Sequence, residues 1–137
     1  MIGYLDSSVL LRLLLKQPHS LPEFTKLKRP IASKLLRTEC LRSLDRFRRA
    51  DLLTEEEHLA SLQQFYDCID SLEWIEISDR VLDRAGSYFP LSLGTLDAIH
   101  LSSAMLWKEQ TESDCHFLTH DTVLQKAASA SGFIVLG

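Results

Sequence analysis

Near its start the chain reads Ile2-Gly3-Tyr4-Leu5-Asp6-Ser7-Ser8, a short apolar run that ends at an acid and two serines. The apolar residues predict a buried strand. Ser7 and Ser8 are helix-capping residues, so a helix is predicted to follow, and Pro18 would close it. A strand followed at once by a helix is the unit of an α/β protein, in which helices cover a parallel sheet on both faces.

The same pattern recurs along the rest of the chain. Further strands are predicted at short apolar runs, which are residues 31–32, 74–77, 117–119 and 133–136. Helices are predicted where apolar residues recur every three or four positions, at residues 21–28, 33–50, 54–69, 78–85, 95–107 and 122–131. No stretch is typical of a linker or a repeat, so residues 1–137 are expected to form a single domain.

The composition is typical of a soluble globular protein, with 45% hydrophobic and 25% charged residues. The longest nearly apolar run, residues 9–15, is too short to span a bilayer, and it lacks the features of a signal peptide. Cys40, Cys68 and Cys115 are odd in number and widely spaced, which argues against a disulfide scaffold or a zinc ribbon. We therefore expect a cytoplasmic protein that does not act at a membrane.

The net charge of −4 hides a strong asymmetry along the chain. Residues 26–49 hold nine basic residues against Glu39 and Asp45, whereas residues 51–84 hold ten acids against two arginines. The two segments are either solvated helix faces or a positive surface that attracts phosphates beside an acidic surface that repels them. Charge alone leaves both interpretations open.

Several acids are placed where a ligand site would form. Asp6 and Asp121 each follow a predicted strand, and they would meet at the carboxyl edge of the sheet if those strands are neighbours. A helix cap is the alternative role for Asp6, although Ser7 and Ser8 can already cap that helix. Asp97 lies beside an apolar stripe near a helix start, where it either interacts with the helix dipole or meets a cation.

Glu39 is a fourth such acid, in an otherwise basic helix, where a salt bridge to Arg42 or Arg37 is the alternative. Asp114 competes with Asp121, but it precedes the strand, and seven extended residues span about 20 Å. Asp114 would therefore lie at the opposite edge of the sheet. Four carboxylates in one cleft repel each other unless cations are present, and oxygen ligands without paired His or Cys suit Mg²⁺ or Mn²⁺ rather than zinc.

Four segments resemble the signature blocks of PIN-domain nucleases, and most closely those of the VapC-type toxins of bacterial toxin–antitoxin pairs. They are Tyr4-Leu5-Asp6-Ser7-Ser8, Arg37-Thr38-Glu39-Cys40-Leu41-Arg42-Ser43-Leu44, Leu96-Asp97-Ala98-Ile99-His100-Leu101 and Leu118-Thr119-His120-Asp121. The resemblance spans nearly the whole chain. It implies a three-layer α/β/α domain with a central parallel sheet of four or five strands. The implied activity is that of a Mg²⁺- or Mn²⁺-dependent endoribonuclease, the toxin of a type II pair.

Carried over residue by residue, the resemblance places the acidic quartet of the family on Asp6, Glu39, Asp97 and Asp121. Ser8 and Thr119 match polar positions that hold the metal's waters or a carboxylate. The resemblance also implies a homodimer, an RNA substrate and a small antitoxin that covers the cleft. We expect an antitoxin helix to pack near residues 10–15 and 44–47, with a basic residue that reaches the quartet.

The basic residues that surround Glu39 are candidates for contacts with flanking RNA phosphates, in particular Lys34, Arg37 and Arg42. His100 is either a general acid or a structural histidine with satisfied hydrogen bonds. Residues 51–83 match no motif of the family, which leaves the identity of the RNA open.

Two other functions are alternatives. A phosphate-accepting receiver domain also has acids at the carboxyl edge of a parallel sheet, but it needs adjacent acids after the first strand, where Asp6 stands alone. A PIN-like fold that no longer cleaves RNA would act only as a binding partner. The presence of all four acids argues against that second alternative.

Overall fold

The computed structural model describes residues 1–18 and 21–137. In these residues five parallel strands form one sheet in the order β3-β2-β1-β4-β5. The strands are β1 (Ile2–Leu5), β2 (Arg29–Ser33), β3 (Glu73–Ile75), β4 (His116–Leu118) and β5 (Ile134–Leu136). The helices are α1 (Ser7–Leu14), α2 (Leu35–Arg49), α3 (Glu55–Ile69), α4 (Asp79–Ala85), α5 (Thr95–Thr111) and α6 (Thr122–Ala130), with a short 3₁₀ helix, η1 (Pro22–Lys26).

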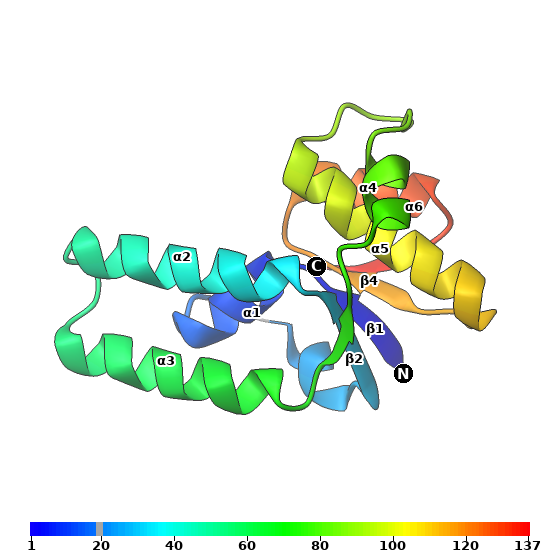
Figure 1. Ribbon diagram of the computed structural model, residues 1–137. Helices are drawn as coiled ribbons and strands as arrows, with labels where there is room; N and C mark the ends of the chain where they lie inside the picture. Colours follow the sequence, from blue (N-terminus) through cyan, green and yellow to red (C-terminus); the bar gives the residue numbers. More distant parts are fainter. Residues whose placement is uncertain (19–20) are drawn as a thin grey trace.

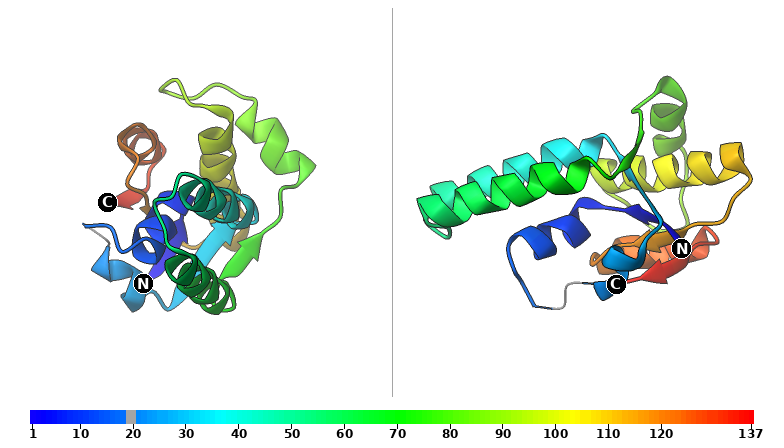
Figure 2. Two further views of the ribbon diagram at one scale, coloured as in Figure 1. Left: turned by 90° about the vertical axis from the view of Figure 1, so that its left-hand side faces the viewer. Right: turned by 90° about the horizontal axis from the view of Figure 1, so that it is seen from below.

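The sheet lies between two layers of helices. Leu5 and Leu118 belong to the core that the sheet forms with α1, α2 and α3, whereas Tyr4 and Phe117 belong to the core with α5 and α6. Helix α4 packs on the outer side of α5 (Figures 1 and 2). Helices α2 and α3 form an antiparallel pair that extends past the sheet (Figure 1). The predicted three-layer α/β fold with a parallel sheet is therefore confirmed.

The element boundaries differ from the sequence predictions by a few residues. Strand β2 is longer than predicted because it includes the polar ends Arg29 and Ser33. Helix α5 continues to Thr111 rather than Trp107, because no Gly or Pro interrupts it before Glu112, which has a left-handed φ of 50°. The segment predicted as a helix at residues 21–28 contains a 3₁₀ helix instead of an α-helix.

The start of α1 corrects one prediction. The N-cap is Asp6, whose Oδ1 accepts a hydrogen bond from the Ser8 backbone N–H at 3.0 Å. Ser7 and Ser8 are already helical, so neither of them caps the helix. Asp6 thus has a structural role in addition to its place at the sheet edge.

The three cysteines are free thiols, as the sequence predicts. Cys40 and Cys115 are buried and Cys68 is partly buried. Within residues 1–18 and 21–137, the structure has no helix that is long and apolar enough to cross a bilayer.

Replacing Thr54 with Ala is expected to lower the free energy of unfolding by about 1 kcal/mol, because it removes the cap of α3. Thr54 Oγ1 accepts from the Glu57 backbone N–H at 3.1 Å, and Glu57 Oε1 accepts from the Thr54 N–H at 3.0 Å. Urea unfolding followed by circular dichroism measures the change. Thr54→Ser keeps the hydroxyl and serves as the control, and equal stability of the two variants would contradict the prediction.

Candidate functional site

The first two acids follow neighbouring strands. β1 pairs in parallel with β4, with Leu5 opposite Leu118, and the Asp6 backbone N–H donates to the Leu118 carbonyl at 3.2 Å. Asp6 and Thr119 therefore leave the carboxyl edge of the sheet side by side. The two strands are therefore neighbours, which is the condition under which Asp6 and Asp121 were expected to meet.

Asp6 is held by hydroxyl groups on both of its carboxylate oxygens. Ser8 Oγ donates to Oδ1 at 2.5 Å, and Thr119 Oγ1 donates to Oδ2 at 2.8 Å. Backbone N–H groups fix the two hydroxyls in turn, that of His120 at Ser8 Oγ and that of Asp121 at Thr119 Oγ1. Burial raises the pKa of Asp6, and the hydrogen bond from Ser8 is the strongest of several contacts that oppose this increase. The side chain is thus a fixed carboxylate with only 4% of its surface exposed.

Asp121 and Asp97 lie beside Asp6. Asp121 is the N-cap of α6, with Oδ1 accepting from the Leu124 N–H at 2.8 Å. Asp97 is half-buried in the first turn of α5. Burial raises the pKa of Asp97, and the negative charge of Asp121 raises it further. Asp6 and Glu39 add to this effect, so Asp97 lies close enough to the other three predicted acids to be repelled by each of them.

Glu39 pairs with neither of the arginines that the sequence offers as an alternative to a ligand role. Its Oε1 lies 2.5 Å from His100 Nε2, so the alternative of a salt bridge to Arg42 or Arg37 is wrong. His100 is 1% exposed, and its Nδ1 lies 2.7 Å from the Tyr4 hydroxyl. His100 is therefore a buried histidine that links a strand residue to an acid of the cluster.

The sequence contained a signal for this link that was not used. His100 is three residues after Asp97, so both lie on one face of α5. A tyrosine in the middle of a buried strand also needs a hydrogen-bond partner for its hydroxyl.

The acids form a cluster rather than a closed set of ligands. In the part of the chain that the structure describes, no three side chains among His, Cys, Asp and Glu are arranged to share one metal ion. The atoms around Asp6 that could ligate a metal ion are carboxylate and hydroxyl oxygens.

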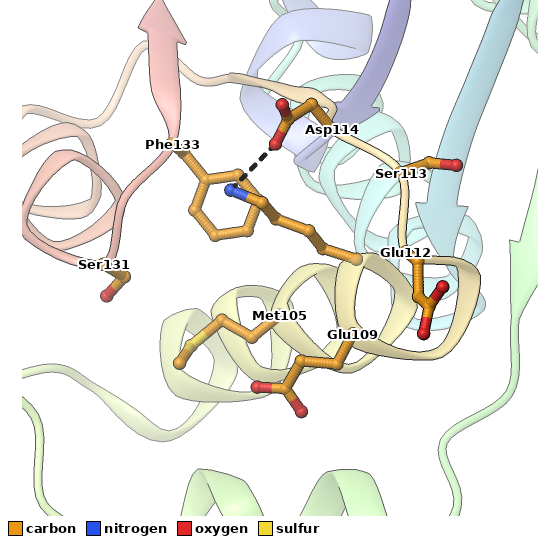
Figure 3. Close-up of a pocket in the computed structure, with 8 residues that line it drawn as sticks. Met105, Glu109, Glu112, Ser113, Asp114, Ser131 and Phe133 are labelled. Atoms are coloured by element: carbon orange, nitrogen blue, oxygen red, sulfur yellow. Dashed lines mark ion pairs between the residues drawn. The ribbon is translucent and has the colours of Figure 1, made fainter.

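Asp114 lies at the other edge of the sheet, as the strand length predicts. It precedes β4, whose first residue His116 is opposite Gly3 in β1. Its side chain is 94% exposed and forms an ion pair of 3.3 Å with Lys108 Nζ (Figure 3). This edge also carries a pocket lined in part by Met105 and Phe133 (Figure 3). Asp114 is therefore not part of the acidic cluster.

Much of the positive charge on α2 is neutralised locally. Asp45 receives hydrogen bonds from Arg42, Arg48 and Arg49 at 3.0 to 3.2 Å. Arg48, followed by Arg49, lowers the pKa of Asp45 to about 2. The alternative of a solvated helix face thus describes this part of α2.

The three predicted phosphate contacts differ in their surroundings. Lys34 pairs with Glu76 at 2.5 Å, and Arg42 pairs with Asp45. Arg37 is exposed and forms no ion pair with any described residue. Of the three, Arg37 has the charge that is most available to a substrate.

Comparisons with known proteins indicate the family of the chain. A family model for the PIN domain matches residues 3–130. Ribonuclease VapC46 of Mycobacterium tuberculosis (strain ATCC 25618 / H37Rv) is 31% identical over 136 residues, which are 97% of this chain and 95% of that protein.

Two solved structures share the fold. One is the crystal structure of VapBC2 from Rickettsia felis bound to a DNA fragment from their promoter. It has a TM-score of 0.65 and 17% identity, and the match covers 99% of this chain and 98% of the other. The second is PAE2754 from Pyrobaculum aerophilum, with a TM-score of 0.61, 18% identity, and coverage of 98% and 83%.

Proposed function

The chain belongs to the PIN-domain family, and from this premise we propose that it is a Mg²⁺- or Mn²⁺-dependent endoribonuclease, the toxin of a VapC-type toxin–antitoxin pair. The identity to a ribonuclease over almost the whole chain supports the reaction class. The observation that carries the proposal is the buried Asp6 carboxylate, grouped with three further acids at the carboxyl edge of the sheet.

A small divalent cation fits this cluster. Burial raises the pKa values of Asp6 and Asp97, and repulsion from the other acids raises that of Asp97 further. A cation between the carboxylates would remove that repulsion. Oxygen donors alone suit Mg²⁺ or Mn²⁺. The proposed ligands are Asp6, Glu39, Asp97 and Asp121, with Ser8 and Thr119 as supporting groups. Side chains of the cluster would have to rotate to bring three carboxylates to one ion.

When bound, the cation supplies Lewis-acid activation of water and neutralises charge on the scissile phosphate. The protein's part is to hold the carboxylates. Ser8 and Thr119 fix Asp6, and the N-terminal turn of α5 presents Asp97. Cys40 is adjacent to Glu39, but burial raises the pKa of its thiol far above the usual range, so it remains protonated and is a poor nucleophile. Hydrolysis then proceeds without a covalent intermediate.

The proposal is tested by incubating the purified chain with RNA in the presence of Mg²⁺ or Mn²⁺. We expect internal cleavage that stops when EDTA is added and resumes when the metal is restored. The folded state is checked by circular dichroism in the same buffer. A folded protein that cleaves no RNA with either metal would contradict the proposal.

Arg37 is proposed to bind an RNA phosphate. Arg37→Gln is therefore expected to weaken RNA binding and to make the affinity less dependent on salt concentration. One lost phosphate contact on a single strand changes the slope of log K against log salt by about 0.7. Fluorescence anisotropy at several salt concentrations measures both quantities. Arg49→Gln is the matched control, because Arg49 lies on the same helix but is held by Asp45. Equal slopes for the two variants would argue against a phosphate contact at Arg37.

We also propose that the protein forms a homodimer and binds a small antitoxin. The structure narrows the surface expected for the antitoxin, because Leu10, Leu14 and Leu44 are buried in the core. In α1 and at its C-terminal end, the accessible apolar surface comes from partly buried residues such as Leu11 and Leu15. Light scattering of the purified chain tests the dimer.

Binding of the antitoxin is expected to weaken as the Mg²⁺ concentration rises. A basic side chain that reaches the cluster competes with the cation for the same carboxylate oxygens. Calorimetric titration at low and high Mg²⁺, with ionic strength held constant, measures the effect. An affinity that does not depend on Mg²⁺ would mean that the antitoxin does not enter the cluster.

A further inference from the structure

A buried chain of hydrogen bonds runs from the core to the acidic cluster. It starts at Tyr4 in β1, passes through His100 in α5 and ends at Glu39 in α2. Tyr4 is 0% and His100 1% exposed, whereas the Glu39 side chain is 19% exposed. Three elements that are distant in the sequence thus meet at one imidazole ring.

Both ring nitrogens of His100 are occupied, which fixes the orientation of the ring. An ionised carboxylate only accepts hydrogen bonds, so Nε2 donates to Glu39 Oε1 at 2.5 Å. On the other side, Nδ1 meets the Tyr4 hydroxyl at 2.7 Å, and the two rings pack edge to face with centroids 6.0 Å apart. Because the ring is buried, solvent water cannot replace either of these partners.

Glu39 depends on this contact for its position. Its Oε1 is bound to His100, and its Oε2 has no hydrogen-bond partner among the described residues. The neighbouring Arg42, which the sequence offered as a partner, is held by Asp45. His100 also interacts electrostatically with Asp6 and Asp97, and it lowers the pKa of both.

We propose that His100 is a positioning residue, which holds Glu39 through Nε2 so that Oε2 faces a divalent cation, while Tyr4 fixes the ring. This inference rests on the proposed function, because it requires that the cluster bind a metal. Hydrogen bonds from outside the ligand set commonly orient ligating groups in this way, and losing one costs roughly 10- to 100-fold in metal affinity or activity.

Two substitutions at position 100 separate positioning from packing. In His100→Asn the amide reaches only as far as Nδ1 of the imidazole, so it keeps a polar group at Tyr4 and loses the contact with Glu39. In His100→Gln the longer side chain reaches the position of Nε2 and can donate to Glu39.

Tyr4→Phe removes only the hydroxyl and keeps the ring stacked on Phe117, with centroids 5.1 Å apart. Ser102→Ala is the control, because Ser102 Oγ is buried on the same helix without a hydrogen-bond partner.

The readout is the dissociation constant for Mn²⁺ of the protein without RNA, measured by electron paramagnetic resonance of the free ion. We expect His100→Asn to weaken Mn²⁺ binding about tenfold and His100→Gln to stay within about threefold of the wild type. Tyr4→Phe should lie between them, and Ser102→Ala should match the wild type. The cleavage rate of His100→Asn should recover at saturating Mn²⁺, which a merely unfolded variant would not do.

Unchanged Mn²⁺ affinity in His100→Asn would overturn the inference, and so would equal losses in folded His100→Asn and His100→Gln. If His100→Asn does not fold, the Mn²⁺ affinity of Tyr4→Phe provides the test. Wild-type affinity in Tyr4→Phe would then overturn the inference that Tyr4 and His100 position Glu39. A wild-type protein that binds no Mn²⁺ would instead refute the proposed function, and this inference with it. Imidazole ¹⁵N shifts provide a metal-free check, in which an Nε2 without a proton would overturn the inference.

Discussion

Replacing Asp6 or Asp97 with Asn is expected to abolish RNA cleavage while the protein stays folded. Both acids are proposed ligands, and Asn has nearly the same shape but no charge to offer a cation. Changes outside the ligand set already cost roughly 10- to 100-fold, so we expect loss of a ligand to reduce the cleavage rate at least about 100-fold.

The fold should survive at position 6 for two physical reasons. Asn is as good an N-cap as Asp, so the start of α1 is kept. Burial also raises the pKa of Asp6 in the folded state. A carboxyl with a raised folded pKa stabilises the fold at low pH and loses that contribution as pH rises through the folded pKa. At neutral pH the wild type therefore carries a cost that Asp6→Asn lacks. This gain offsets the loss of the hydrogen bond from Thr119 Oγ1 to Oδ2, which an amide nitrogen cannot accept, so the variant should remain folded.

RNA cleavage with Mn²⁺ and thermal melting are measured on the same samples. Asp114→Asn is the matched control, since Asp114 is exposed at the opposite edge of the sheet. Cleavage by Asp6→Asn or Asp97→Asn at the wild-type rate would exclude that acid as a required ligand.

The order of strands and helices could be predicted because it depends on local patterns. Each strand is a short apolar run, and each long helix has apolar residues at helical spacing. The placement of Asp6 beside Thr119 followed from the same patterns, once the parallel sheet brought the ends of β1 and β4 to one edge. The strand ends were less predictable, because residues such as Arg29 pair in the ladder despite a polar side chain.

The partner of Glu39 could not be predicted from its neighbours in sequence. Spacing favoured Arg42, three residues away on the same helix, but Asp45 is three residues beyond Arg42 and takes its guanidinium. The partner that Glu39 has instead, His100, is 61 residues away. The partner of Glu39 depends on which side chains the tertiary fold brings next to it. The charges that are nearby in the sequence do not give that information.

Charge counts alone left two interpretations of residues 26–49 open. Nine basic residues against two acids fitted either solvated helix faces or a surface that attracts phosphates. In the structure one acid, Asp45, accepts hydrogen bonds from three arginines, and Lys34 pairs with Glu76, which is distant in sequence. The surface that remains for RNA is smaller, and it is centred on fewer side chains such as Arg37.

Adding Mn²⁺ to the protein is expected to raise its melting temperature by roughly 8 to 10 °C when the ion is at about 100 times its dissociation constant. Binding to the folded state alone then adds about 2.7 kcal/mol. For a domain of this size, each kcal/mol shifts the melting temperature by about 3 to 4 °C. Charge neutralisation among the carboxylates contributes to the affinity, and thus sets the Mn²⁺ concentration at which this increase is reached. EDTA should reverse it, and Asp97→Asn should lack most of it.

The same stabilisation should shrink as pH falls from neutral into the acidic range, because protons and the metal compete for the same oxygens. Asp6 and Asp97 have raised pKa values in the metal-free fold, so they take up protons earlier than exposed acids as pH falls. Protonation stabilises the metal-free fold and also weakens metal binding, and both effects reduce the difference between the two states. Calorimetric melting with and without Mn²⁺ across this pH range measures the difference. If the shift were independent of pH, or intact in Asp97→Asn, the ion would bind away from the acidic cluster, since binding at the cluster competes with protons for Asp6 and Asp97.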